Sequence, residues 1–170
     1  GKGNARRAQA LLQSPLAQAQ ELGGVLLGRD VEPATLSIKR LVALGSHEIL
    51  SVRQACWRLC EADVERLKRA AAQSLRLCDA KWQDTRQWAF GFVRDCFGPE
   101  ELTPPLLVAI ADSVRADVMA FGRELITRFF DDEHGAEYLL KLAEHPTAGL
   151  QLYASNFLER FAAGNLEHLQ

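Results

Sequence analysis

Hydrophobic residues recur along this chain at helical spacing and, on a longer scale, at a nearly constant step. In the segment 52–60, apolar side chains fall at i, i+3, i+4, i+7 and i+8, which places them on one face of an α-helix. The same pattern is found at 19–27, 85–93, 118–126 and 150–158, so that successive segments are 33, 33, 33 and 32 residues apart. The chain is therefore predicted to repeat one helical unit about five times.

Equivalent positions of the five segments carry side chains of similar size. One column is apolar and bulky in four of its five members: Leu22, Ala55, Trp88, Phe121 and Tyr153. The next column is small in every member: Gly23, Cys56, Ala89, Gly122 and Ala154. Because packed helices approach to about 8–10 Å, we expect the small column to mark a crossing between helices of adjacent layers.

A second apolar stretch precedes each segment, with an aliphatic residue eight positions before each segment start: Leu11, Leu44, Leu77, Ile110 and Leu142. Short polar or turn-forming stretches such as 45–47 and 144–147 separate the two apolar stretches. Each unit is therefore predicted to be a helical hairpin. The predicted fold is all-α: a right-handed superhelix, or solenoid, in which 1–170 form one domain. The expected repeats are 4–30, 31–63, 64–96, 97–129 and 130–163, and 164–170 begin a further helix.

The amino-acid composition limits the classes of protein to which the chain can belong. The chain has 170 residues, of which 48% are hydrophobic and 25% charged, and this excludes a disordered chain. No apolar run reaches the roughly 18 residues that a membrane-spanning helix needs, and the start lacks the apolar core of a signal peptide. We therefore expect a cytoplasmic protein with no membrane partner. Because the chain starts at Gly1 rather than Met, we expect it to be one piece of a longer protein.

Charge is unevenly distributed along the chain. Residues 1–100 hold 15 Lys and Arg against 11 Asp and Glu, whereas 101–170 hold 5 against 11. This asymmetry either steers an acidic ligand to one end or reflects solvated helix faces. The four cysteines show no paired CxxC spacing and are expected to be reduced and buried.

The second helix of each predicted hairpin resembles that of HEAT repeats, in the armadillo/HEAT superfamily. The residues that carry the resemblance are an opening Val-Arg, a small residue and an apolar residue: Val52, Arg53, Ala55, Cys56 and Leu59, then Thr85, Arg86, Ala89 and Phe92. The short period is similar to that of compact bacterial forms, and the ankyrin and tetratricopeptide motifs are not present. The resemblance implies a pairing of the helix Arg with an acidic residue near a neighbouring turn: Arg53 with Asp79, and Arg86 with Asp112.

Such solenoids bind partners along the ridge of their second helices, so the resemblance implies an interaction or scaffolding module for a protein or peptide. Residues four apart on a helix share a flank, which predicts a partner-binding stripe of alternating cationic and apolar side chains. Its members are Arg53, Trp57, Arg86, Phe90, Met119 and Arg123. The alternative interpretation is that the aromatic residues fill the seam between layers and the arginines cover them.

A nucleic-acid-binding module is the second functional hypothesis. Some HEAT-like solenoids resemble DNA glycosylases that recognise alkylated bases with tryptophan, acidic and basic side chains. Residues of these types cluster in the second and third repeats: Arg53, Trp57, Lys81, Trp82, Asp84, Arg86 and Trp88. The net charge of −2 disfavours duplex binding. We expect no enzyme activity, no cofactor and no metal, and His47 and His145 are interpreted as turn residues.

Two features of the C-terminal part complete the predictions. An acidic corner formed by Asp131, Asp132, Glu133 and Glu137 is either a site or a solvated loop. Apolar residues of the last repeat are expected to contact further repeats or another subunit. They are Leu150, Leu152, Phe157 and Phe161.

Overall fold

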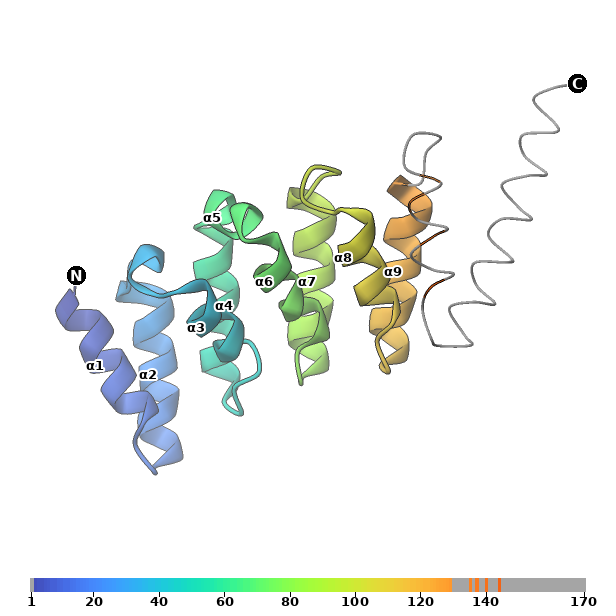
Figure 1. The fold of residues 1–170 in the computed structure, drawn as a ribbon. Helices are drawn as coiled ribbons and strands as arrows, with labels where there is room; N and C mark the ends of the chain where they lie inside the picture. Colours follow the sequence, from blue (N-terminus) through green and yellow to red (C-terminus); the bar gives the residue numbers. More distant parts are fainter. Residues whose placement is uncertain (1, 130–134, 136, 138–139, 141–143, 145–170) are drawn as a thin grey trace, which may run out of the picture. The chain divides into compact units, whose positions relative to one another are not determined.

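Helices are the only regular secondary structure in the part of the chain that the computed structural model describes, which is 2–129 together with 135, 137, 140 and 144 (Figure 1). The predicted all-α class is confirmed for these residues. The α-helices are α1 (Lys2–Leu12), α2 (Ala17–Asp30), α3 (Ile38–Leu44), α4 (Leu50–Glu61), α5 (Val64–Arg69), α6 (Ala71–Ser74), α7 (Gln83–Cys96), α8 (Pro104–Ala111) and α9 (Ala116–Phe129). Two 3₁₀-helices are η1 (Pro33–Thr35) and η2 (Leu75–Asp79). Among these, none has the length and apolar character needed to cross a membrane.

The chain divides into two compact units, Gly1–Glu101 and Leu102–Gln170. In the first unit α1 packs against α2 and α3 against α4, while α4 lies between α2 and α7. In the second unit α8 packs against α9. Several predicted features lie outside the described residues: the fifth repeat apart from 135, 137, 140 and 144, the further helix, 131–133 of the acidic corner, the last apolar layer and His145.

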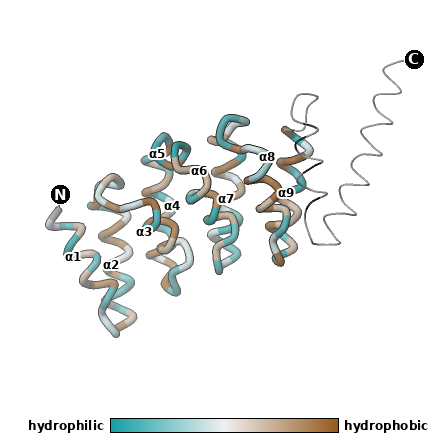
Figure 2. The backbone as a smooth tube through the Cα atoms, viewed as in Figure 1, coloured by the Kyte–Doolittle hydropathy of each residue, from teal (hydrophilic) through white to brown (hydrophobic). Residues whose placement is uncertain are grey.

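The core of the first unit is built from leucines on the inner faces of its helices. Leu27, Leu41 and Leu67 are fully buried, and each comes from a different helix. Hydrophobic and hydrophilic residues alternate along the helices (Figure 2), as the helical spacing predicts. Burial of apolar surface is therefore the force that orients these helices.

Local signals account for where several helices begin. The Ser37 hydroxyl caps α3 by accepting a hydrogen bond of 3.0 Å from the amide of Arg40. Helix α8 opens with Pro104, whose fixed φ suits the first helical turn and whose missing amide hydrogen costs nothing there. These starts follow the turn-forming residues that the sequence places between apolar stretches.

The third predicted hairpin differs from a simple helix pair, because its first arm is divided into α5, α6 and η2. Ala70 leaves the helical region with φ of −108° and ψ of 45°, and this ends α5. The carbonyl of Leu67 is instead satisfied by the Ser74 hydroxyl, which donates to it at 2.7 Å. A buried serine thus supplies the hydrogen bond that this carbonyl accepts at the break.

The two glycines of the small column, Gly23 and Gly122, serve packing within a hairpin rather than between layers as predicted. A Cβ added to Gly23 would lie 3.0 Å from the carbonyl oxygen of Ala8, on the first helix of the same hairpin. In the second unit, a Cβ on Gly122 would lie 2.4 Å from the backbone nitrogen of Ala111. These glycines therefore let the two arms of a hairpin touch at the level of the backbone.

Leu22 is the exception in the bulky column, since 51% of it is exposed. Other members of this column face the second helix of the preceding hairpin: Ala55 lies against Gly28, and Trp88 stacks on Trp57. Helix α2 has no preceding second helix among the described residues. Leu22, the residue of α2 that belongs to this column, is therefore exposed on the surface.

Candidate functional site at the α4–α7 junction

Side chains at three positions, each 33 residues apart, make the same contact with the preceding turn. Each donates a hydrogen bond to the carbonyl of the residue six positions earlier. The pairs are Gln20 with Ser14 at 2.7 Å, Arg53 with His47 at 3.1 Å and Arg86 with Ala80 at 2.9 Å. The two arginines also donate to the next carbonyl, that of Glu48 or Lys81. The contact fixes the start of each second helix against its turn.

Arg53 also joins α4 to α7 through the carboxylate of Asp84. Its Nε lies 3.1 and 3.2 Å from the two carboxylate oxygens, and its Nη2 lies 2.9 Å from Oδ2. The predicted acidic partner of Arg53 was Asp79, and the carboxylate it binds here belongs to Asp84. The guanidinium matches a carboxylate only when it meets it edge-on, and the first turn of α7 presents Asp84 in that position.

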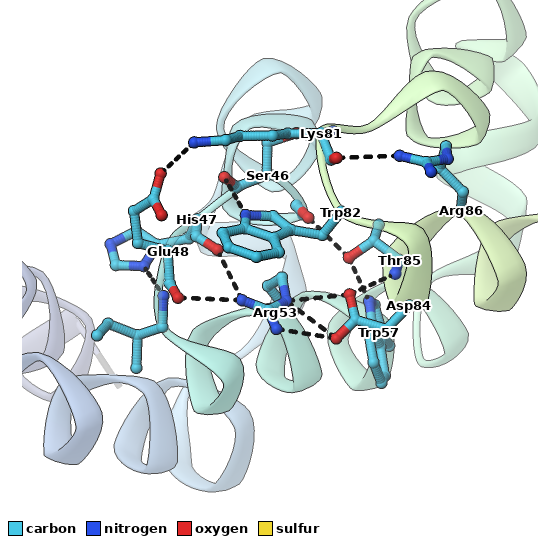
Figure 3. A network of polar contacts seen from close by, with 12 residues as sticks. Ser46, His47, Glu48, Arg53, Trp57, Lys81, Trp82, Asp84, Thr85 and Arg86 are labelled. Atoms are coloured by element: carbon cyan, nitrogen blue, oxygen red, sulfur yellow. Dashed lines mark hydrogen bonds and ion pairs between the residues drawn. The ribbon is translucent and has the colours of Figure 1, made fainter. Parts of the chain in front are cut away.

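The indole ring of Trp82 is placed between two cationic side chains (Figure 3). The guanidinium carbon of Arg53 lies 4.6 Å from the ring centroid, and Nζ of Lys81 lies 5.4 Å from it. Trp82 donates through Nε1 to the carbonyl of Ser46 at 3.3 Å. Lys81 pairs with Glu48, and this hydrogen bond holds the pKa of the Glu48 carboxyl below its ordinary value.

Thr85 forms a second connection between α4 and α7. Its hydroxyl accepts a hydrogen bond of 3.1 Å from Nε1 of Trp57 and donates one of 2.7 Å to the carbonyl of Gly45. Thr85 has no exposed surface. This buried hydroxyl forms both of its hydrogen bonds. It stabilises the junction, because a buried polar group without a hydrogen-bond partner is costly.

A row of stacked aromatic rings runs from α4 along α7. The ring centroids of Trp57 and Trp88 are 6.1 Å apart, and those of Trp88 and Phe92 are 5.0 Å apart. Phe97 meets Phe92 edge-on at 5.8 Å. Trp88 is also tied to the end of α4, because its Nε1 donates to Oε1 of Glu61 at 2.8 Å.

A cleft of about 400 Å³ opens beside this row, where α4 ends and α5 begins. Its lining includes Glu61, Val64, Trp88, Gly91, Phe92 and Asp95. Its volume lies within the range of small-ligand pockets, roughly 300–1,000 Å³. The sequence predictions did not identify this cleft. The signal for it was Gly91, a glycine inside a strongly helical pattern, which is unfavourable unless packing or function requires it.

The structure buries two of the six residues of the predicted binding stripe and leaves the other four half-buried. Arg53 is 7% and Phe90 4% exposed, whereas Trp57 and Arg86 are half-buried. In the second unit Met119 and Arg123 are half-buried. Burial of Phe90 and the stacking of Trp57 on Trp88 agree with the interpretation that the aromatic residues fill the seam between layers, whereas Arg53 is itself buried rather than a cover over them. Partner binding by the stripe stays a prediction.

The polar residues considered for base recognition do come together, with Arg53, Lys81, Trp82 and Asp84 in one network (Figure 3). They engage one another: the Asp84 carboxylate accepts from Arg53, and Trp82 lies between two cations. Trp88 belongs to the aromatic row and pairs with Glu61 instead.

His47 lies in the turn before α4, where its Nδ1 accepts a hydrogen bond of 3.0 Å from the amide of Ile49. Burial, with the nearby charges of Arg40 and Arg53, holds the pKa of His47 below its ordinary value, although Glu48 opposes this. The neutral imidazole is the form that accepts the bond. His47 is therefore a turn residue in this structure.

Within the described ranges, no three His, Cys, Asp or Glu side chains are grouped so that they could hold a metal ion. Comparison of the chain with protein-family models, with curated proteins and with solved structures gave no match.

Proposed function

We propose that the chain is a HEAT-like array of helical hairpins that acts as an interaction module for a partner protein. The observation that carries the proposal is the recurrent turn contact made by Gln20, Arg53 and Arg86. One contact, made by side chains 33 residues apart, is the mark of a repeated structural unit. Arrays of this type present an extended surface that suits protein binding.

The chemistry of the α4–α7 junction supports binding over catalysis. Its acidic and basic groups are committed to each other, above all Arg53 with Asp84. A catalytic acid or base must instead be within reach of a substrate proton. The aromatic and carboxylate side chains that line the cleft beside the junction are groups that recognise a ligand.

Affinity capture tests this proposal. The immobilised chain is incubated with native lysate, with and without nuclease, and each captured protein is purified and titrated against the chain by calorimetry. We expect at least one protein to be retained after nuclease treatment and to bind directly. Direct binding matters because a lysate contains indirect associations.

The second hypothesis predicts a different result. If capture is lost with nuclease, and labelled duplex DNA binds with an affinity that falls steeply with salt, the chain is a nucleic-acid-binding module. Absence of both a direct protein partner and DNA binding at low salt would contradict both hypotheses.

A further inference from the structure

The cleft beside α7 is lined by a glycine, Gly91, that has open space around it. A Cβ added to Gly91 would meet no atom within 4 Å, whereas a Cβ on Gly24 or Gly122 would lie 2.5 or 2.4 Å from a neighbouring atom. Close packing therefore explains Gly24 and Gly122 but not Gly91. Since glycine weakens a helix relative to alanine, its presence in α7 calls for another reason. The structural consequence of the missing side chain is that the cleft stays open.

Two carboxylates give the cleft a negative charge. Glu61 is oriented by the hydrogen bond from the Trp88 indole, at 2.8 Å. Asp95 is exposed one turn beyond Gly91, and no hydrogen bond or ion pair joins it to another residue in the part of the chain that is described. The cation nearby, Lys68, pairs with a different carboxylate.

The thiol of Cys96, which also lines the cleft, responds to this charge. Burial is the main cause that raises the pKa of Cys96, and Asp95 and Glu61 raise it further, while Lys68 lowers it. Both carboxylates therefore act on the same point of the cleft. A cation placed there would be attracted by both.

Aromatic rings supply the other half of the recognition chemistry. Trp88 and Phe92 line the cleft and stack on each other at 5.0 Å with an interplanar angle of 20°. Trp57 and Phe92 both stack on Trp88, so a cation meets the part of the half-buried Trp88 ring that lines the cleft rather than an open ring face. A guanidinium group suits such a site best, because its planar fork of donors matches the two carboxylates and it is more weakly hydrated than an ammonium group.

We propose that this cleft binds an arginine side chain of a partner protein. The guanidinium donates to Glu61 and Asp95 and packs against the part of Trp88 that lines the cleft, and the open space over Gly91 admits the aliphatic stem. This assignment rests on the proposed interaction function and names the part of the partner that the cleft recognises.

Titration with small probes tests the cleft without knowledge of the partner. The probes are N-acetyl-arginine methylamide, its lysine analogue and its neutral citrulline analogue. Binding is followed by the indole N–H resonance of Trp88 in isotope-labelled protein, assigned with a Trp88→Phe variant. We expect saturable shifts with the arginine probe, weaker binding of lysine and none of citrulline.

Two substitutions at one position separate blockage of the cleft from damage to the fold. The leucine side chain of Gly91→Leu fills the cleft. The arginine probe should then no longer shift the resonances of Trp88 or of the other residues that line the cleft. Gly91→Ala leaves space and should retain these shifts. Both replace a glycine in a helix, so neither is expected to lower the urea midpoint.

A charge variant tests the carboxylate contribution. Asp95→Asn should weaken binding of the arginine probe about two- to fivefold, as expected for an exposed charge pair. Glu100→Gln, which removes an exposed carboxylate outside the cleft lining, is the matched control and should leave binding unchanged.

Three results would overturn the assignment: no response of Trp88 to the arginine probe, equal binding of citrulline, or unchanged binding in Gly91→Leu. The proposed function is tested separately. A captured partner that binds the Gly91→Leu variant as tightly as the parent leaves the interaction function standing and removes the cleft as its site. If the arginine probe binds but no partner is captured, the cleft assignment stands and the proposed interaction function is contradicted.

Discussion

The α2–α4 and α4–α7 junctions join equivalent helices of the first unit, but they are built from different chemistry. At the first, a Cβ on Gly24 would lie 2.5 Å from the Ser51 hydroxyl oxygen and 2.6 Å from the backbone nitrogen of Val52. At the second, side chains stand between the helices, with Trp57 and Trp88 stacked and Arg53 bound to Asp84. One junction is a backbone contact and the other is a layer of side chains.

The difference follows from single residues at equivalent positions. Adding 33 to Gly24 gives Trp57, and adding 33 to Gly28 gives Glu61. Both glycines of α2 face α4, and the corresponding Trp and Glu of α4 face α7. Glu61, which takes the place of Gly28, is one of the residues that line the cleft beside the second junction.

The largest expected effect is on the glycine junction. Gly24→Leu should lower the free energy of unfolding by about 3 kcal/mol or more, because the new side chain meets α4 backbone that cannot move aside. The measurement is urea denaturation followed by circular dichroism. Gly91→Leu is the control, since it makes the same change in a helix with open space around it. Equal losses in both variants would contradict the proposed difference between the junctions.

Arg53→Met should have the next largest effect. It removes the bonds to Asp84 and to two turn carbonyls, and we expect a loss of about 2–3 kcal/mol. The Asp84 carboxylate is 37% exposed and can be hydrated, which keeps the loss below that of a fully buried pair. Arg53→Lys should not restore stability, because lysine lacks the planar fork.

A double-mutant cycle with Asp84→Asn isolates the pair at the second junction. Strong coupling between the two changes is expected because the residues are in direct contact. Purely additive losses in chemical denaturation would show that Arg53 acts through the turn carbonyls alone.

Thr85→Val should lower the free energy of unfolding by about 1–2 kcal/mol, since the valine keeps the shape but leaves Trp57 Nε1 and the Gly45 carbonyl without their partner. Thermal unfolding gives the comparison. Thr85→Ser, which keeps the hydroxyl, should lose less. If the valine variant were as stable as the parent, the hydrogen bonds of the Thr85 hydroxyl would not contribute to the stability of the junction.

The smallest expected effect concerns pH. Because the pKa of His47 is lowered in the folded state from an ordinary value of 6.5, its contribution to stability is present above that value and is lost as pH falls through the folded pKa. The His47→Asn variant should therefore show a weaker fall in unfolding free energy than the parent on acidification below about pH 6.5. Parallel pH profiles would contradict this.

Much of the fold could be predicted from periodicity, because burial of an apolar face depends on spacing along the helix. The second helices α2, α4, α7 and α9 lie where the repeated segments predicted them. The broken arm of α5, α6 and η2 could not be predicted, because it depends on a hydrogen bond between Ser74 and Leu67 that exists only in the folded chain.

The candidate site was predicted in part. The sequence singled out Arg53 and Trp57 and offered a seam-filling role as one interpretation, but the acidic partner differed by five residues from the one expected. Sequence spacing gives the helix face on which a residue lies, and it does not give the rotation of the neighbouring helix. That rotation brings Asp84 to Arg53.

The sequence by itself determined that this protein is helical and that one 33-residue pattern recurs, because side-chain polarity along a helix is a local property. Only the tertiary structure decided which second helices touch through their backbones, which are separated by aromatic side chains, and where a cleft remains. These depend on the volumes that facing residues present to each other across a junction, such as Gly24 against Val52 or Trp57 against Trp88.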